Sequence, residues 1–311
     1  MPATLACSPP LQNAAVPLQA LLLVLAAATL HALWNIAAKR AGGDHRFAFL
    51  TVLMSVLLWS PLALWSAPAE LPRWGALAWV VVIVSAALHV VYFLTLLRGY
   101  READLSVVYP VARGGGPLLT AAAAVLFLGE TLSTAGVFGV LGVCGGVFLI
   151  AGGPGLWRGG ARAAQDPAAR ARLLGGLRWG ALTGALIACY TVVDGYGVKV
   201  LLMAPLLFDF MCNALRLPMM LPLVWRDGAG LRQALRTQWR PALVVAALGP
   251  AGYIMVLHAV QMAPLSHVAP AREVSMLIAA FIGGRLLGEG DRVLRLLGAA
   301  CIAGGVMALA W

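Results

Sequence analysis

Ten apolar stretches, each about as long as a bilayer is thick, limit what this chain can fold into. An α-helix rises about 1.5 Å per residue, so about 20 apolar residues are enough to cross the hydrocarbon layer. We therefore predict an all-α integral membrane bundle of ten transmembrane helices. The predicted spans are 17–38, 47–65, 74–97, 105–128, 132–152, 179–199, 205–225, 241–261, 266–287 and 293–311.

Composition agrees with a protein dissolved in lipid. Of the 311 residues, 61% are hydrophobic and only 11% are charged, whereas a soluble domain carries about 25% charged residues. The formal net charge is +10, and such an excess often points to nucleic acid. Here the arginines lie mainly between apolar spans, where they act as orientation signals. We expect a multi-pass protein of the cell's inner membrane and no nucleic-acid partner.

Loop charge predicts how the chain is oriented. When Arg113, Arg216 and Arg272 are set aside, nineteen basic residues remain, and seventeen of them lie in or beside the loops after the first, third, fifth, seventh and ninth spans. Positively charged loops stay in the cytoplasm. The charge pattern therefore places both termini outside the cytoplasm, and the first span, with no basic residue before it, is expected to be retained.

The two halves of the chain repeat one another. Residues 103–110 match residues 263–270, one residue is then skipped, and a constant offset of 159 matches Arg113 with Arg272 and residues 128–130 with 287–289. Each half contains an odd number of spans, so the second copy enters the membrane from the opposite side. Inverted repeats of this kind are typical of secondary transporters, with the site between the repeats.

The repeat predicts a two-domain organisation of two five-helix inverted repeats. The first repeat covers 17–152 and the second covers 179–311. Between them, residues 153–178 are rich in Arg, Gly and Ala and are predicted to be a linker.

Charges inside the predicted spans are the strongest candidates for function, because each costs about 2.5–3.5 kcal/mol on insertion scales. Helical rise places Arg113 about 12 Å deep, toward the side where the first span ends. Inversion places Arg272 and Glu273 nearer the other face, within reach of Asp194, and Arg216 falls nearest the middle. We expect these groups to converge on a central cavity with aromatic walls.

The candidate substrate-binding residues lie on the first, third, fourth, sixth, seventh, eighth and ninth spans. They are Trp34, Asn35, Tyr92, Arg113, Tyr190, Asp194, Arg216, Tyr253, Arg272 and Glu273.

Structural roles compete with this interpretation. Asp194 and Arg272 can form an ion pair that locks two helices without touching a ligand. Arg113 can bond carbonyl groups freed by Pro110 or reach toward the interface. Glu130 follows a glycine at a helix end, where a role in a turn is favoured.

The doubled pattern resembles the EamA family of the drug/metabolite transporter superfamily. The residues that carry the resemblance are Tyr109-Pro110-Val-Ala-Arg113 through Leu128-Gly129-Glu130, its counterpart Ser266 through Glu289, Trp34-Asn35…Lys39, and Tyr190 through Gly197. The resemblance covers nearly the whole chain and implies a transporter. It does not define a substrate, because the family carries amino acids, other metabolites, nucleotide-sugar-like compounds and drugs. Relatives are commonly described with both termini inside, in contrast to the loop charges.

We expect a transmembrane secondary transporter, with export favoured, for a small zwitterionic or anionic metabolite such as an amino acid. The alternatives are a multidrug or nucleotide-sugar-like carrier and, less favoured, a passive channel. Coupling to protons is left open, as is a monomer or a homodimer. No HExxH, GxSxG or Walker A motif occurs, which argues against an enzyme. The five cysteines form no CxxC or Cys/His cluster, so no metal or cofactor is expected.

Overall fold

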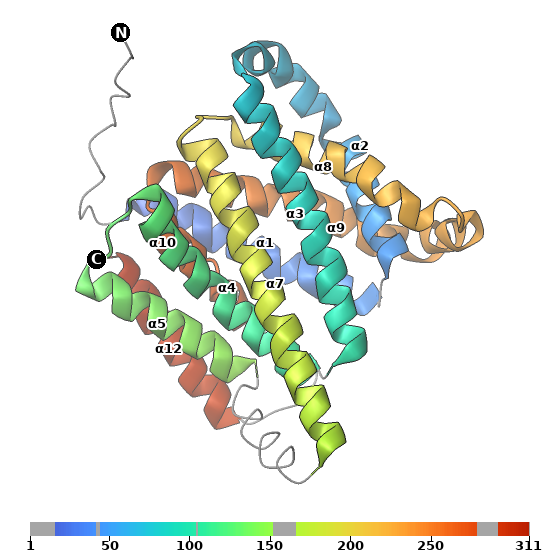
Figure 1. The fold of residues 1–311 in the computed structure, drawn as a ribbon. Helices are drawn as coiled ribbons and strands as arrows, with labels where there is room; N and C mark the ends of the chain where they lie inside the picture. The colour runs from blue at the N-terminus through green and yellow to red at the C-terminus, as the bar shows by residue number, and fades with distance from the viewer. Residues whose placement is uncertain (1–15, 42–43, 104, 152–165, 279–291, 311) are drawn as a thin grey trace.

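The computed structural model describes residues 16–41, 44–103, 105–151, 166–278 and 292–310. All regular structure within these ranges is helical (Figure 1). Seven of the described helices are long and apolar enough to cross a membrane, and two further apolar helices are shorter. The expectation of an all-helical membrane bundle is confirmed, whereas the count of ten spans is not established. Part of the expected ninth span, residues 279–287, lies outside the described residues.

The first half of the chain forms α1 (Leu18–Ala41), α2 (His45–Glu70), a 3₁₀ turn η1 (Leu71–Arg73), α3 (Ala76–Glu102), α4 (Leu105–Leu128) and α5 (Thr134–Ile150). The second half forms α7 (Pro167–Lys199), α8 (Pro205–Val224), α9 (Gly228–Met262), α10 (Leu265–Ala271) and α12 (Arg292–Ala310).

α7 begins within the segment that was expected to be a linker. The side chain of Asp166 accepts a hydrogen bond from the backbone N–H of Ala168, and Pro167 takes the first helical turn. A carboxylate cap followed by proline is a strong start signal, and the Ala/Arg-rich sequence after it favours helix. Residues 167–178 are therefore helical, and α7 extends beyond the apolar stretch that predicted it.

The two halves pack against each other reciprocally. α3 lies against α7, and its counterpart α9 lies against α1. α2 packs against α8, and α5 runs beside α12 at one edge of the bundle (Figure 1). These four contacts fit a two-fold relation between the halves, because the first two exchange under it and each of the others is its own counterpart. α4 also packs closely against α7, a contact with no comparable counterpart between α10 and α1 among the described residues.

The residue skipped between the repeats coincides with a break in the second Pro-bearing helix. α4 continues from Leu105 to Leu128 through Pro110 and Arg113, whereas α10 ends at Ala271. The N–H of Glu273 then donates to the carbonyl of Pro270 at 2.9 Å, a bond spanning three residues. Removing one residue from an α-helix rotates the remainder of the helix by about 100°, and a tighter 3₁₀ turn absorbs that change. The shorter Pro–Arg spacing therefore accounts for the break.

Glu130 joins the two halves at the end of α4. Its carboxylate accepts from Lys199 Nζ at 2.9 Å and from the backbone N–H groups of Leu265 and Ser266 at 2.7 and 2.9 Å. Lys199 also donates to the carbonyl of Ala263. We call this cluster (Glu130, Lys199 and the start of α10) the Glu130 latch. It lies at the face of the bundle where α4, α7 and α9 end.

Close packing of α5 on α12 predicts a sharp difference between two adjacent glycines. A β-carbon at Gly146 would lie 2.5 Å from the carbonyl oxygen of Gly298, whereas at Gly145 it would meet nothing within 4 Å. Gly146→Ala is expected to destabilise the protein by about 1–3 kcal/mol, because the helices must move apart. Gly145→Ala is expected to be neutral or slightly stabilising. Thermal unfolding in detergent measures both, and equal effects would contradict this packing.

The Glu130 latch predicts a pH-dependent contribution to stability. Burial acts to raise the pKa of Glu130, but the Lys199 ammonium and the two N–H donors outweigh it and hold the pKa below its usual value. Because the folded pKa is depressed, the contribution is complete above the ordinary carboxyl pKa and is lost as pH falls through the folded value. Glu130→Gln is expected to cost about 1.5–3 kcal/mol near neutral pH and to flatten the acid limb of the stability profile.

The matched control for that profile is Glu70→Gln. Glu70 pairs at 3.6 Å with Arg73, whose side chain is 75% exposed, and such surface pairs contribute about 0–1 kcal/mol. If Glu130→Gln behaved like Glu70→Gln at every pH, the latch would not stabilise the fold.

Candidate functional site

A cavity of about 330 Å³ lies inside the bundle and is walled by helices from both halves. α1, α2, α3 and α4 contribute from the first half, and α7, α8, α9 and Arg272 contribute from the second. The expected set of helices is therefore present, and α2 joins it through Thr51, Val52 and Ser55. Ser55 bonds the carbonyls of Thr51 and Ala246, which brings this face of α2 inward against α9.

Most of the predicted site residues reach this cavity. Those that line it are Trp34, Asn35, Tyr92, Arg113, Tyr190, Arg216, Tyr253 and Arg272. The remaining two, Asp194 and Glu273, are both 1% exposed and lie behind the wall. Each contacts side chains of the cavity wall: Asp194 contacts Tyr253 and His89, and Glu273 contacts Arg113.

The three arginines have different partners. Arg113 Nη2 lies 2.8 Å from Glu273 Oε2, and Arg216 Nη1 donates to Asn213 Oδ1 at 3.3 Å. Within the described ranges, Arg272 forms no side-chain ion pair, although it is 7% exposed and its Nε has no partner. Arg216 likewise forms no ion pair among the described residues, so Arg216 and Arg272 both present an unpaired guanidinium group to the cavity, and Arg272 also lacks the amide contact that Arg216 makes.

The ion pairing differs from the pairing that helix depth suggested. Arg272 and Glu273 were expected within reach of Asp194, with an Asp194–Arg272 ion pair as one possibility. Glu273 meets Arg113 of the other half. Because the helix breaks after α10, the Glu273 side chain points in a different direction from the one that a continuous helix would give it. In the described part of the chain, Asp194 forms no ion pair with Arg272. Asp194 instead accepts a hydrogen bond from the hydroxyl of Tyr253 and lies 3.9 Å from His89 Nε2.

Sequence reasoning missed a third buried carboxylate. Asp209 lines the cavity, is 5% exposed and accepts a hydrogen bond from Asn213 Nδ2 at 2.9 Å. The signal was present, because Asp209 is a charge inside an apolar stretch. Further polar residues reach the wall without having been selected: His31, Thr51, Ser55, His89, Tyr109, Thr183 and Asn213.

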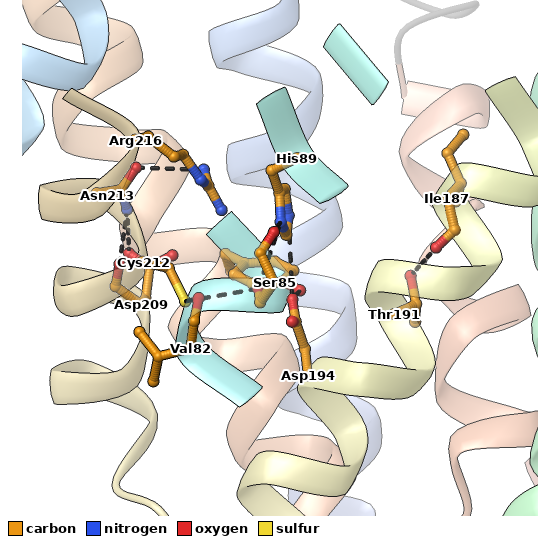
Figure 2. A network of polar contacts seen from close by, with 11 residues as sticks. Val82, Ser85, His89, Ile187, Thr191, Asp194, Asp209, Cys212, Asn213 and Arg216 are labelled. Atoms are coloured by element: carbon orange, nitrogen blue, oxygen red, sulfur yellow. Dashed lines mark hydrogen bonds and ion pairs between the residues drawn. The ribbon is translucent and has the colours of Figure 1, made fainter. Parts of the chain in front are cut away.

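Polar contacts at one end of the cavity form a connected group on α3, α7 and α8 (Figure 2). His89 Nδ1 lies 2.9 Å from the carbonyl of Ser85, and the thiol of Cys212 lies 3.5 Å from Ser85 Oγ. His89 also stacks on Tyr190, with ring centroids 4.0 Å apart. Within the described residues, no group of three His, Cys, Asp or Glu side chains is arranged to hold a metal ion.

The cavity extends toward the face opposite the Glu130 latch. Asn35 and Leu96 line it near the ends of α1 and α3, and Tyr109 lines it near the start of α4. These helix ends adjoin the arginine-rich loops. The latch lies on the other face, where α4, α7 and α9 end, and Asp209 near the start of α8 is the wall residue toward that face.

The Arg113–Glu273 pair predicts strong coupling between the two halves. Glu273→Leu leaves the Arg113 guanidinium buried without its partner, which is expected to cost about 3–5 kcal/mol. The double variant Arg113→Met/Glu273→Leu is expected to recover most of that loss, because neither charge is then stranded. Unfolding measurements on the four proteins of this cycle test the coupling, and simple additivity of the two single effects would contradict it.

Comparison with known proteins identifies a family and a solved structure that resemble this chain. The sequence profile of the EamA-like transporter family matches residues 18–152 and again residues 174–311. A crystal structure of another protein, 16% identical in sequence, superposes with a TM-score of 0.65 over 93% of this chain and 95% of that chain. At that identity the likeness concerns the fold alone. No match was found among curated proteins.

The family matches cover both halves and nearly the whole chain. They agree with the membrane-length helices and with the reciprocal packing of the halves. The chain therefore belongs to the EamA-like transporter family of the drug/metabolite transporter superfamily, and it is a multi-pass membrane transport protein.

Proposed function

We propose that this protein is a secondary transporter that exports a small zwitterionic or anionic metabolite by alternating access. The observation that carries the proposal is a cavity between the halves that holds a nine-tenths buried guanidinium group, that of Arg272, with no ion pair among the described residues. A guanidinium in a low-dielectric site binds a carboxylate or phosphate oxygen through charge-assisted, often bidentate bonds. The two halves, 17–152 and 179–311, are proposed to be inverted repeats that rock around this site.

The size of the cavity favours a small solute. Ligand pockets of proteins measure about 300–1,000 Å³, and 330 Å³ is at the lower end of that range. Tyr92, Tyr190 and Tyr253 contribute aromatic surface for an apolar part of the solute. A nucleotide sugar would need more room than a cavity of this volume provides.

The charges favour a solute that carries both signs. The three arginines are opposed by Asp194, Glu273 and Asp209, so the fully ionised cluster sums to zero. Without Asp209, the three arginines and the other two carboxylates would leave an excess of one positive charge. Asp209 and Arg272 both face the cavity, so an ammonium and a carboxylate each find an opposite charge. A lipophilic cation would meet the guanidinium of Arg272, which makes a multidrug carrier the weaker alternative.

The function is tested first by comparing extracellular metabolites of cells with and without the protein, and then by counterflow in proteoliposomes with the compound that accumulates. Wild type is expected to show saturable counterflow. Arg272→Gln is expected to lose at least about tenfold in apparent affinity, because a charge-assisted contact worth about 1.5–3 kcal/mol is removed. Export and import are distinguished by the sign of the extracellular change.

The matched control is Arg236→Gln, which removes an exposed arginine of α9 outside the cavity. It is expected to leave counterflow unchanged. Flux that does not saturate and rises linearly with the gradient would contradict a carrier and favour a passive channel.

A further inference from the structure

We infer that Asp194 and His89 together form a proton-binding site that couples transport to a proton gradient. The inference rests on the proposed transport function and identifies the ion and the residues through which that cycle is driven. Three observations support it: the burial of Asp194, the hydrogen bonds of Asp194 and His89, and the position of the pair between the cavity and the Glu130 latch.

Asp194 is buried, and its contacts leave its charge poorly balanced. It is 1% exposed, one carboxyl oxygen accepts from Tyr253, and the other, Oδ1, has no hydrogen-bond partner among the described residues. Within the same residues, His89 is the only basic group within ion-pair distance of it. An ionised carboxylate in such a place costs several kcal/mol, so a proton held on Asp194 or shared with His89 lowers the free energy of the site.

The tautomer of His89 is determined by its backbone contact. Nδ1 lies 2.9 Å from the carbonyl oxygen of Ser85, which can only accept a hydrogen bond. Nδ1 therefore carries the hydrogen in the neutral ring, and Nε2 presents its lone pair toward Asp194 Oδ2 at 3.9 Å. Figure 2 shows the imidazole extending between Ser85 and Asp194.

These contacts define a proton route. His89 lines the cavity and Asp194 does not. A proton from cavity water bonds to Nε2, and then the Nε2–H bond breaks while an O–H bond forms on Asp194, leaving the electron pair on Nε2. A separation of 3.9 Å exceeds a hydrogen bond, so transfer requires an approach of about 1 Å or one bridging water.

The surrounding groups oppose one another in charge. Asp209 and Arg216 face the site from α8, Tyr253 from α9, Tyr190 from α7 itself, and Arg272 from the break after α10. The two arginines interact with Asp194 only beyond ion-pair distance.

The position of the pair suits alternating access. Asp194 lies five residues before Lys199 at the end of α7, roughly 7.5 Å along the helix axis. The same helix end carries the Glu130 latch. Opening of the latch face would bring water to Asp194, stabilise its carboxylate and release the proton there. The same opening would hydrate the solute cavity from that side.

A titration that needs no transported solute tests the site. The protein is reconstituted in lipid with ¹³C-carboxyl aspartate, and infrared spectra follow the C=O stretch of protonated carboxyl groups against pH. A labelled band that is lost in Asp194→Asn but kept in Asp209→Asn is expected during the titration, because Asp209 is a second buried carboxyl group that can hold a proton. Asp166→Asn is the matched control on the same helix, because Asp166 is exposed and asparagine also caps a helix.

His89→Gln is expected to keep the Asp194 band but to slow its loss after a jump to alkaline pH, because the exchange route through Nε2 is missing. Spectra of wild type and Asp194→Asn that agree at every pH would overturn the inference.

Transport gives the second readout, with a ¹⁴C-labelled mixture of L-amino acids as the probe in proteoliposomes whose membrane potential is clamped. One proton exchanged per solute allows a gradient of one pH unit to drive up to about tenfold accumulation. Asp194→Asn is expected to abolish the accumulation driven by the pH gradient. Accumulation that persists in Asp194→Asn would overturn only the role of Asp194 in coupling. Loss of counterflow from wild type would contradict the proposed function, and the infrared result would then still decide the proton site.

Discussion

The absence of water from the hydrocarbon layer is the constraint on which this structure depends. A buried polar group must find its partner within the protein, because lipid offers none. The backbone meets this requirement by forming helices. Polar side chains meet it through contacts such as Asn213 on Asp209, and through Gln261 of α9, which donates to the carbonyls of Val198 and Met203 where α7 ends. Arg113, Arg216 and Arg272, each with a buried Nε that lacks a hydrogen-bond partner in the described part of the chain, all line one cavity.

Duplication of a five-helix unit explains the frame, and departure from exact duplication explains the site. Reciprocal contacts such as α3 on α7 and α9 on α1 result from two similar units. The single residue missing between Pro270 and Arg272 makes the second Pro-bearing helix break where the first continues. That break directs Glu273 to Arg113 and leaves Arg272 without an ion pair among the described residues. The two halves therefore present different chemistry from similar positions.

The Glu130 latch and the cavity fit one state of the transport cycle that we propose. The Glu130 latch holds the ends of α4 and α7 and the start of α10 together. At the other end, residues such as Asn35 and Leu96 carry the cavity toward the arginine-rich loops. The Asp194–His89 pair lies between these two regions. A change that opens one end and closes the other would alter the hydration of that pair, which is how a proton gradient can bias the equilibrium.

The sequence by itself determined that the chain lies in a lipid bilayer, that it is helical and that its halves repeat. It also indicated the family and most residues of the cavity wall. These depend on apolar length, periodic matches and the cost of charge in lipid, all of which are local or additive along the chain. Tertiary structure decided which charges meet. Helix rise gives the depth of a side chain but not the neighbour it faces, so the Arg113–Glu273 pair, the hydrogen bond from Tyr253 to Asp194 and the entry of α2 into the wall depended on how the helices pack and where one of them breaks.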